Sequence, residues 1–159
     1  MLAEQLKTYL DKAGIHYAWV MAAIVFMFTL ATSTTASAPQ ILILPITEAY
    51  GWDISDVSIA TGLMYFMTAM LCPIGAPLML RIGVINVVLI VIFLEVIGLL
   101  CTVLAFEKWH LLVSIGLCLG IASGIIGLGL SATVATRWFT ARRGLVVGIM
   151  TSAFAAGQL

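Results

Sequence analysis

Long apolar runs separated by short polar stretches dominate the pattern of this chain. A helix that crosses a bilayer needs roughly 20 consecutive apolar residues. The pattern offers four runs of that order and a shorter fifth. We therefore expect an all-α, polytopic bundle of membrane helices over the ranges 17–44, 57–80, 84–106, 111–136 and 144–159.

The composition excludes several classes of protein. Of the 159 residues, 63% are hydrophobic and only 9% are charged, whereas soluble domains carry about a quarter charged residues. The net charge is zero, which leaves no basic footprint for nucleic acid. No residue spacing typical of an enzyme active site, a metal centre or a cofactor site occurs, so we expect no enzyme, no metal and no cofactor.

Basic residues gather in alternate connections between the runs, and such connections face the cytoplasm. With a cytoplasmic N-terminus, only Lys108 would lie outside. The inner residues would be Lys7, Lys12, Arg81, Arg137, Arg142 and Arg143. This pattern predicts a multi-pass protein of the cell (cytoplasmic) membrane, with the lipid bilayer as its first partner.

The run 144–159 would form a helix only about 24 Å long, against a hydrocarbon core of about 30 Å. No charge, turn or aromatic anchor ends it after Thr151. We therefore expect the chain to be an N-terminal fragment, with further helices of the same protein as partners.

Small residues recur at helical spacing in the last two runs. Gly116, Gly120 and Gly124 lie four residues apart, and Gly148 belongs to a similar line in 144–159. Small residues let membrane helices approach closely. The pattern fits either a moving interface in a transporter or static packing between helices.

A polar stripe marks one face of the first run, where Thr29, Ser33, Ser37 and Gln40 share a helical side. Pro39 should kink the helix there. We interpret this stripe as part of a substrate path, which Tyr65 of the second run could reach. The alternative is that the hydroxyl groups bond to carbonyl groups of their own helix.

Glu95 is the one carboxylate deep within an apolar run. Carboxylates at membrane depth are rare and often functional. Glu95 is a candidate for proton coupling or for a structural hydrogen bond between helices, and the alternative is a neutral packing residue.

Two stretches resemble the major facilitator superfamily. ATVATRWFTARRGLVVGIMTSAFAAGQL resembles the junction of helices four and five in its oxalate:formate antiporter and monocarboxylate transporter branch. AYGWDISDVSIATGL resembles that branch's first external loop and the start of helix two. The resemblance implies the first five helices of a secondary transporter, with helices one and four beside the path of a monocarboxylate or dicarboxylate.

The chain departs from the family's motif between helices two and three. Arg81 and Gly83 match it, but Ala76 replaces the first glycine and Leu80 the acidic residue. The arginine that many proton-coupled members carry in helix four would fall at Gly116. Basic residues for holding an anion are absent from the apolar runs and would have to lie in the missing half.

The sequence thus favours a transporter of a small solute, such as an organic anion, by alternating access. A non-transporting membrane scaffold that assembles through its glycine faces is the alternative from another class. A complete small transporter that works as an oligomer is a third possibility.

Overall fold

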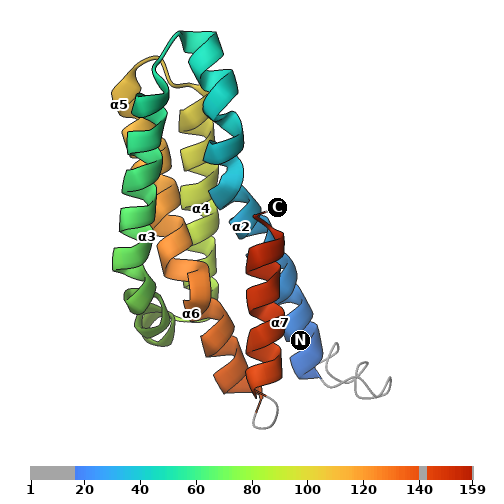
Figure 1. Cartoon of the computed structure of the whole chain (residues 1–159). Helices are drawn as coiled ribbons and strands as arrows, with labels where there is room; N and C mark the ends of the chain where they lie inside the picture. The colour runs from blue at the N-terminus through green and yellow to red at the C-terminus, as the bar shows by residue number, and fades with distance from the viewer. Residues whose placement is uncertain (1–16, 140–142, 159) are drawn as a thin grey trace.

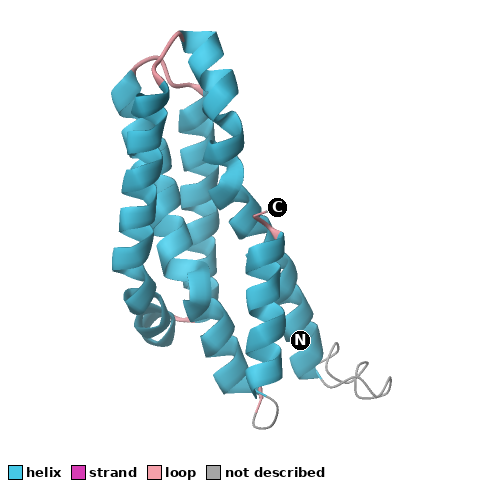
Figure 2. Ribbon diagram, in the orientation of Figure 1, coloured by secondary structure: helices cyan, strands magenta, loops and turns pink. Residues whose placement is uncertain are grey.

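A computed structural model describes residues 17–139 and 143–158. Within these ranges the chain forms helices and short connections, without a strand (Figure 2). Four spans are long and apolar enough to cross a membrane, and α7 is shorter. The expected all-α bundle of membrane helices is confirmed.

The helices run up and down the bundle with short connections at both ends (Figure 1). They are α2 (Tyr17–Tyr50), α3 (Ile54–Ile82), α4 (Val84–Val103), α5 (Lys108–Leu111), η1 (Leu112–Leu119), α6 (Gly120–Trp138) and α7 (Arg143–Ala156). The segments α5, η1 and α6 follow one another without a break in sequence, and we call them together the fourth span.

The first helix is longer than the sequence pattern predicted. We expected it to end before Pro45, but α2 continues through Pro39 and Pro45 to Tyr50. It ends at Gly51, whose φ of +65° is the left-handed conformation that commonly follows a helix. Proline costs less in membrane helices because neighbouring helices and local adjustments satisfy the freed backbone groups. The range 17–44 is therefore corrected at its end.

The other boundaries differ from the predicted ranges by at most three residues, close to the usual uncertainty of helix ends. Gly83 alone links α3 to α4, as its φ of +91° allows a turn that other residues rarely adopt. Its amide donates to the carbonyl of Met79 at 3.1 Å and so closes the end of α3.

The fourth span is less regular than the single helix that we predicted. Leu112–Leu119 is a π-helix, and Gly127 (φ −4°, ψ −123°) breaks the helical path of α6. Glycine adopts such a conformation because it has no Cβ atom. The π-helix and the break at Gly127 therefore divide the fourth span into four stretches, namely α5, η1 and the two parts of α6.

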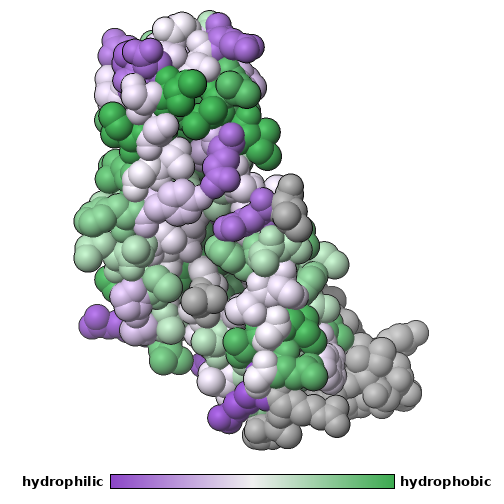
Figure 3. Space-filling view, viewed as in Figure 1, coloured by the Kyte–Doolittle hydropathy of each residue, from purple (hydrophilic) through white to green (hydrophobic). Residues whose placement is uncertain are grey.

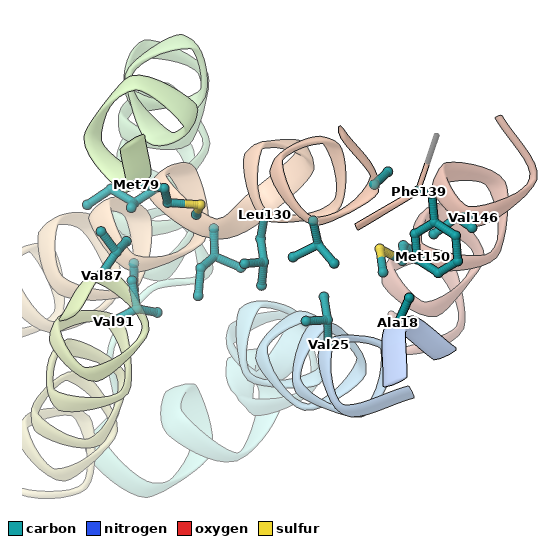
Figure 4. Close-up of a cluster of buried hydrophobic side chains, with 14 residues drawn as sticks. Ala18, Val25, Met79, Val87, Val91, Leu130, Phe139, Val146 and Met150 are labelled. Carbon is teal, nitrogen blue, oxygen red and sulfur yellow. The ribbon is translucent and has the colours of Figure 1, made fainter. Parts of the chain in front are cut away.

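Two apolar clusters hold the bundle together, one toward each end. The first joins the start of α2 to α7, α6 and α4, as Ala18, Val25, Leu130, Val91 and Met150 show in Figure 4. The second cluster lies beside the other end of α2 and includes Ile46, Val57, Met64, Leu111 and Ile115. Both clusters depend on the fourth span, which is the most deeply buried of the four.

Candidate functional site

The hydroxyl groups of the α2 stripe are buried and bonded within their own helix. Thr29 Oγ1 donates to the carbonyl of Val25 at 2.8 Å. Ser33 Oγ donates to the carbonyl of Leu30 at 3.0 Å. Their exposed fractions are 0% and 1%, and that of Ser37 is 6%. These three predicted path residues are therefore satisfied without a solute or water.

The end of α7 covers part of this stripe. Ser37 Oγ, which donates to Thr34 at 2.9 Å, also lies 3.4 Å from the carbonyl oxygen of Gly157. A Cβ atom added to Gly157 would overlap Ser33 Oγ and lie 2.5 Å from the carbonyl oxygen of Leu30. Ser33 and Ser37 thus form a tight helix–helix contact that only glycine permits.

Beyond that contact the stripe opens to the surface at Gln40. The Gln40 side chain is exposed, and its Nε2 donates a hydrogen bond to Tyr65 Oη on α3. Tyr65 is 47% exposed. The structure therefore brings together two predicted path residues from different helices, on the outside of α2 and α3.

With the bilayer centred on α2 and α3, this pair lies at membrane depth. At 1.5 Å per residue, Gln40 is about 10 Å from the middle of α2 and Tyr65 about 5 Å from the middle of α3. Both fall within a hydrocarbon layer about 30 Å thick. Figure 3 shows hydrophilic groups part-way along the bundle as well as at its ends. An exposed amide at this depth is costly in lipid, so it should face water or protein.

The glycine line of the fourth span faces α3. A Cβ on Gly120 would lie 2.9 Å from the Met64 carbonyl oxygen, and one on Gly124 would lie 3.0 Å from that of Thr68. A Cβ on Gly116 would meet only the Leu63 side chain, at 2.7 Å. The glycines thus let two helix backbones touch.

Thr68 stabilises the contact between α3 and α6 with a hydrogen bond between the two helices. Its Oγ1 donates to the Met64 carbonyl at 2.8 Å and approaches the Gly120 carbonyl oxygen at 3.2 Å. Farther along α3, a Cβ on Gly75 would overlap the carbonyl oxygen of Ile125. We did not single out Gly75 or Gly157 from the sequence. Gly75 lies between Pro73 and Pro77, which was the available signal.

Gly148 has a different environment. A Cβ at this position would meet nothing within 4 Å, and the residue lies on the exposed side of α7. Its role in helix packing therefore stays a prediction.

Glu95 is partly buried on α4. Its Oε1 atom is shielded and has no hydrogen-bond partner among the residues that the structure describes. The carboxyl group does not form the structural hydrogen bond between helices through this atom, and its proposed proton role stays untested.

Apart from Glu95, the charged residues in the described ranges lie toward the two ends of the bundle. Arg81 and Arg137 lie in the last turns of α3 and α6, and Arg143 Nε donates to the Phe139 carbonyl at 2.6 Å. Arg142 falls outside the described residues. At the opposite end, Lys108 Nζ forms an ion pair with Asp56 Oδ2 at 2.5 Å.

Comparison with known proteins identifies the family. A family model described as Major Facilitator Superfamily matches residues 11–159, nearly the whole sequence. No curated protein and no solved structure matches the chain. The chain therefore belongs to the major facilitator superfamily, whose members are secondary transporters rather than enzymes.

Proposed function

We propose that this chain, as a member of the major facilitator superfamily, contributes Gln40 and Tyr65 to the path of a small solute. Transporters of this superfamily work by rocking helical repeats around a site near the middle of the bilayer. The observation that carries the proposal is the hydrogen bond between two exposed polar side chains at that depth.

Direct contact with lipid hydrocarbon would be unfavourable for the Gln40–Tyr65 pair. An amide has two donors and an acceptor with two lone pairs, and Gln40 uses one donor on Tyr65. Unsatisfied polar groups in hydrocarbon cost several kcal/mol each. A water-filled path or a bound solute would satisfy the remaining groups of Gln40.

The buried hydroxyl groups extend the proposed path. Ser33 and Ser37 lie on the same face of α2 as Gln40, beneath the end of α7. If α7 tilts away from α2 during transport, these hydroxyl groups become accessible. Thr29 would then continue the polar line toward the start of α2.

We propose a small organic anion as the solute, of the kind carried by the oxalate:formate and monocarboxylate branch. The Gln40 amide and the Tyr65 hydroxyl can both donate hydrogen bonds to a carboxylate. The arginines that the structure describes lie at the helix ends, so the compensating positive charge would come from outside the described spans. The basic end would face the cytoplasm of the cell, together with the N-terminus.

The test measures water access at position 40. Cys72, Cys101 and Cys118 are replaced by serine, and a single cysteine is introduced by Gln40→Cys or, as the matched control, Ile41→Cys. Ile41 is 70% exposed on the neighbouring side of α2. A membrane-impermeant methanethiosulfonate should modify position 40 at least about tenfold faster, because the thiolate that reacts forms in water and not in hydrocarbon.

The solute class is tested with the same protein. Formate, oxalate and lactate, added separately, should slow the modification at position 40, whereas an uncharged sugar should not. Equal rates at positions 40 and 41 would refute the path. A fast reaction at position 40 that no carboxylate slows would keep the path and reject the organic anion.

A further inference from the structure

A cavity opens at the basic end of the bundle, between the start of α2, the start of α4 and the end of α6. Its volume is about 480 Å³, within the range of roughly 300–1,000 Å³ that is typical of small-molecule sites. Most of its wall is aliphatic or thioether side chain, from Met21, Val25, Val84, Ile85 and Val134. Among the described residues, the polar groups of the lining come from Asn86, Arg137 and Trp138 and from the backbone at Gly83.

The electrostatics of this end favour a negatively charged occupant. Arg137 is exposed, and no hydrogen bond or ion pair joins it to another residue in the described ranges. Arg81 lies in the last turn of α3, two residues before Gly83. The carboxylates of Asp53, Asp56 and Glu107 lie at the opposite end.

The surroundings of the cavity are set by the bilayer. Because α2, α4 and the fourth span are long enough to cross it, their ends lie near the headgroups, where tryptophan and arginine are favoured. Trp138 is 42% exposed at this level. An occupant therefore meets apolar walls toward the membrane interior and a guanidinium toward the water.

We propose that this cavity binds an anionic phospholipid, with an acyl chain against the apolar wall and the phosphate group on Arg137. Basic pockets between membrane helices are the type of site that recognises anionic lipid headgroups. A free phosphate ion would leave the apolar wall uncovered. A neutral lipid would leave the arginine without a counter-charge.

A second groove on the same protein serves as an uncharged comparison for the cavity at Arg137. The groove between α2 and α7 has a volume of about 300 Å³ and lies beside Trp19, Phe26, Val146 and Ile149. None of the described residues that line it is charged. It can take apolar chains of any lipid, and we expect no headgroup preference there.

The experiment follows the fluorescence of Trp138 in the full chain, reconstituted in vesicles. Trp19, Trp52 and Trp109 are replaced by phenylalanine. Brominated phosphatidylglycerol and brominated phosphatidylcholine, which quench tryptophan on contact, are compared at equal mole fractions. We expect the anionic lipid to occupy the site about fivefold more strongly, since one basic residue near an anionic surface contributes about that factor.

Variants distinguish binding of the anionic lipid at Arg137 from a general attraction of anionic lipids to the basic end of the bundle. Arg137→Gln should abolish the preference, and Arg137→Lys should retain it because the charge remains. Arg143→Gln should also retain it, because the Arg143 side chain is bonded to the Phe139 carbonyl. A protein with Trp109 as its only tryptophan should show no preference, since Trp109 Nε1 donates to Glu107 at the acidic end.

Three results would overturn the proposal. They are equal quenching of Trp138 by both lipids, a preference that survives Arg137→Gln, and no quenching by either lipid. The last result would mean that protein rather than lipid covers the cavity. Inorganic phosphate in the buffer provides a further check. If it abolished the preference for the anionic lipid, the occupant would be a soluble anion and the proposal would also fail.

Discussion

Gly75→Ala tests whether close backbone contact holds α3 against α6. The added Cβ would overlap the carbonyl oxygen of Ile125 and lie 3.0 Å from its carbonyl carbon. Both atoms belong to the backbone, so no side-chain rotation can relieve the clash. One of the two helices must shift.

The magnitude follows from two opposing effects. Overpacking of a tight interior typically costs about 1–3 kcal/mol. Replacing a helical glycine by alanine returns about 0.5–1 kcal/mol through lower backbone entropy in the unfolded state. We therefore expect Gly75→Ala to lower the free energy of unfolding by about 1 kcal/mol, within a range of roughly 0–2.5 kcal/mol.

Gly62→Ala is the matched control on the same helix. Gly62 is exposed, and a Cβ there would meet nothing within 4 Å, so only the gain of about 0.5–1 kcal/mol should remain. Gly116→Ala should lie between the two, because its Cβ would meet the flexible Leu63 side chain.

The assay is unfolding by dodecyl sulfate in mixed micelles, followed by tryptophan fluorescence, with all variants in the same lipid-like detergent. The expected order of midpoints is Gly75→Ala below Gly116→Ala below Gly62→Ala. If Gly75→Ala unfolds at or above the midpoint of Gly62→Ala, the contact between α3 and α6 does not control the stability of the bundle.

The remaining predictions concern charge. Glu95→Leu should be at least as stable as the original protein, because an unpartnered buried polar atom costs about 1–3 kcal/mol; a lower unfolding midpoint would reveal a partner for the carboxyl group. In intact cells, an impermeant thiol reagent should label Asp53→Cys but reach Arg81→Cys only after permeabilisation, and the reverse result would invert the topology. Lys108→Gln should leave the unfolding midpoint nearly unchanged, since exposed ion pairs contribute little.

The sequence predicted the helices because lipid imposes a simple rule on the length of apolar runs. It misplaced the end of α2 because the helix was expected to stop before Pro45, whereas α2 continues through Pro45 to Tyr50 and ends at Gly51. The π-helix over Leu112–Leu119 and the break at Gly127 had no counterpart in the pattern. Both are local departures from regular α-helical geometry, which the spacing of apolar residues does not encode.

In the candidate site, too, some features were predictable from the sequence and others depend on the fold. Helical periodicity placed Ser33, Ser37 and Gln40 on one face, and the structure has them so. Helical periodicity could not show that α7 covers Ser33 and Ser37 and leaves Gln40 exposed. Likewise, Gly116 and Gly120 indicated a close approach between helices, but the choice of α3 as the partner comes from the fold.

The two tight interfaces correspond to each other under the repeat that the superfamily implies. Inverted three-helix repeats relate the first span to the fourth and the second to the fifth. The fourth span packs closely on α3, and α2 packs closely on α7. Exchange of the repeats therefore maps the glycine interface of the fourth span onto the hydroxyl interface of α2, with Ser33 and Ser37 in place of glycines and Gly157 supplying the close approach.

This correspondence predicts the effect of Gly157→Ala. Its Cβ would overlap Ser33 Oγ, so it should separate α7 from α2 and destabilise the fold, whereas Gly148→Ala should have no such effect because nothing lies within 4 Å. Ser33→Gly should restore much of the loss in the double variant, since it removes the overlapping atom. Failure of that rescue would mean that the Leu30 carbonyl, 2.5 Å from the added Cβ, sets the limit, and that the hydroxyl groups of α2 are not the counterpart of the glycine line.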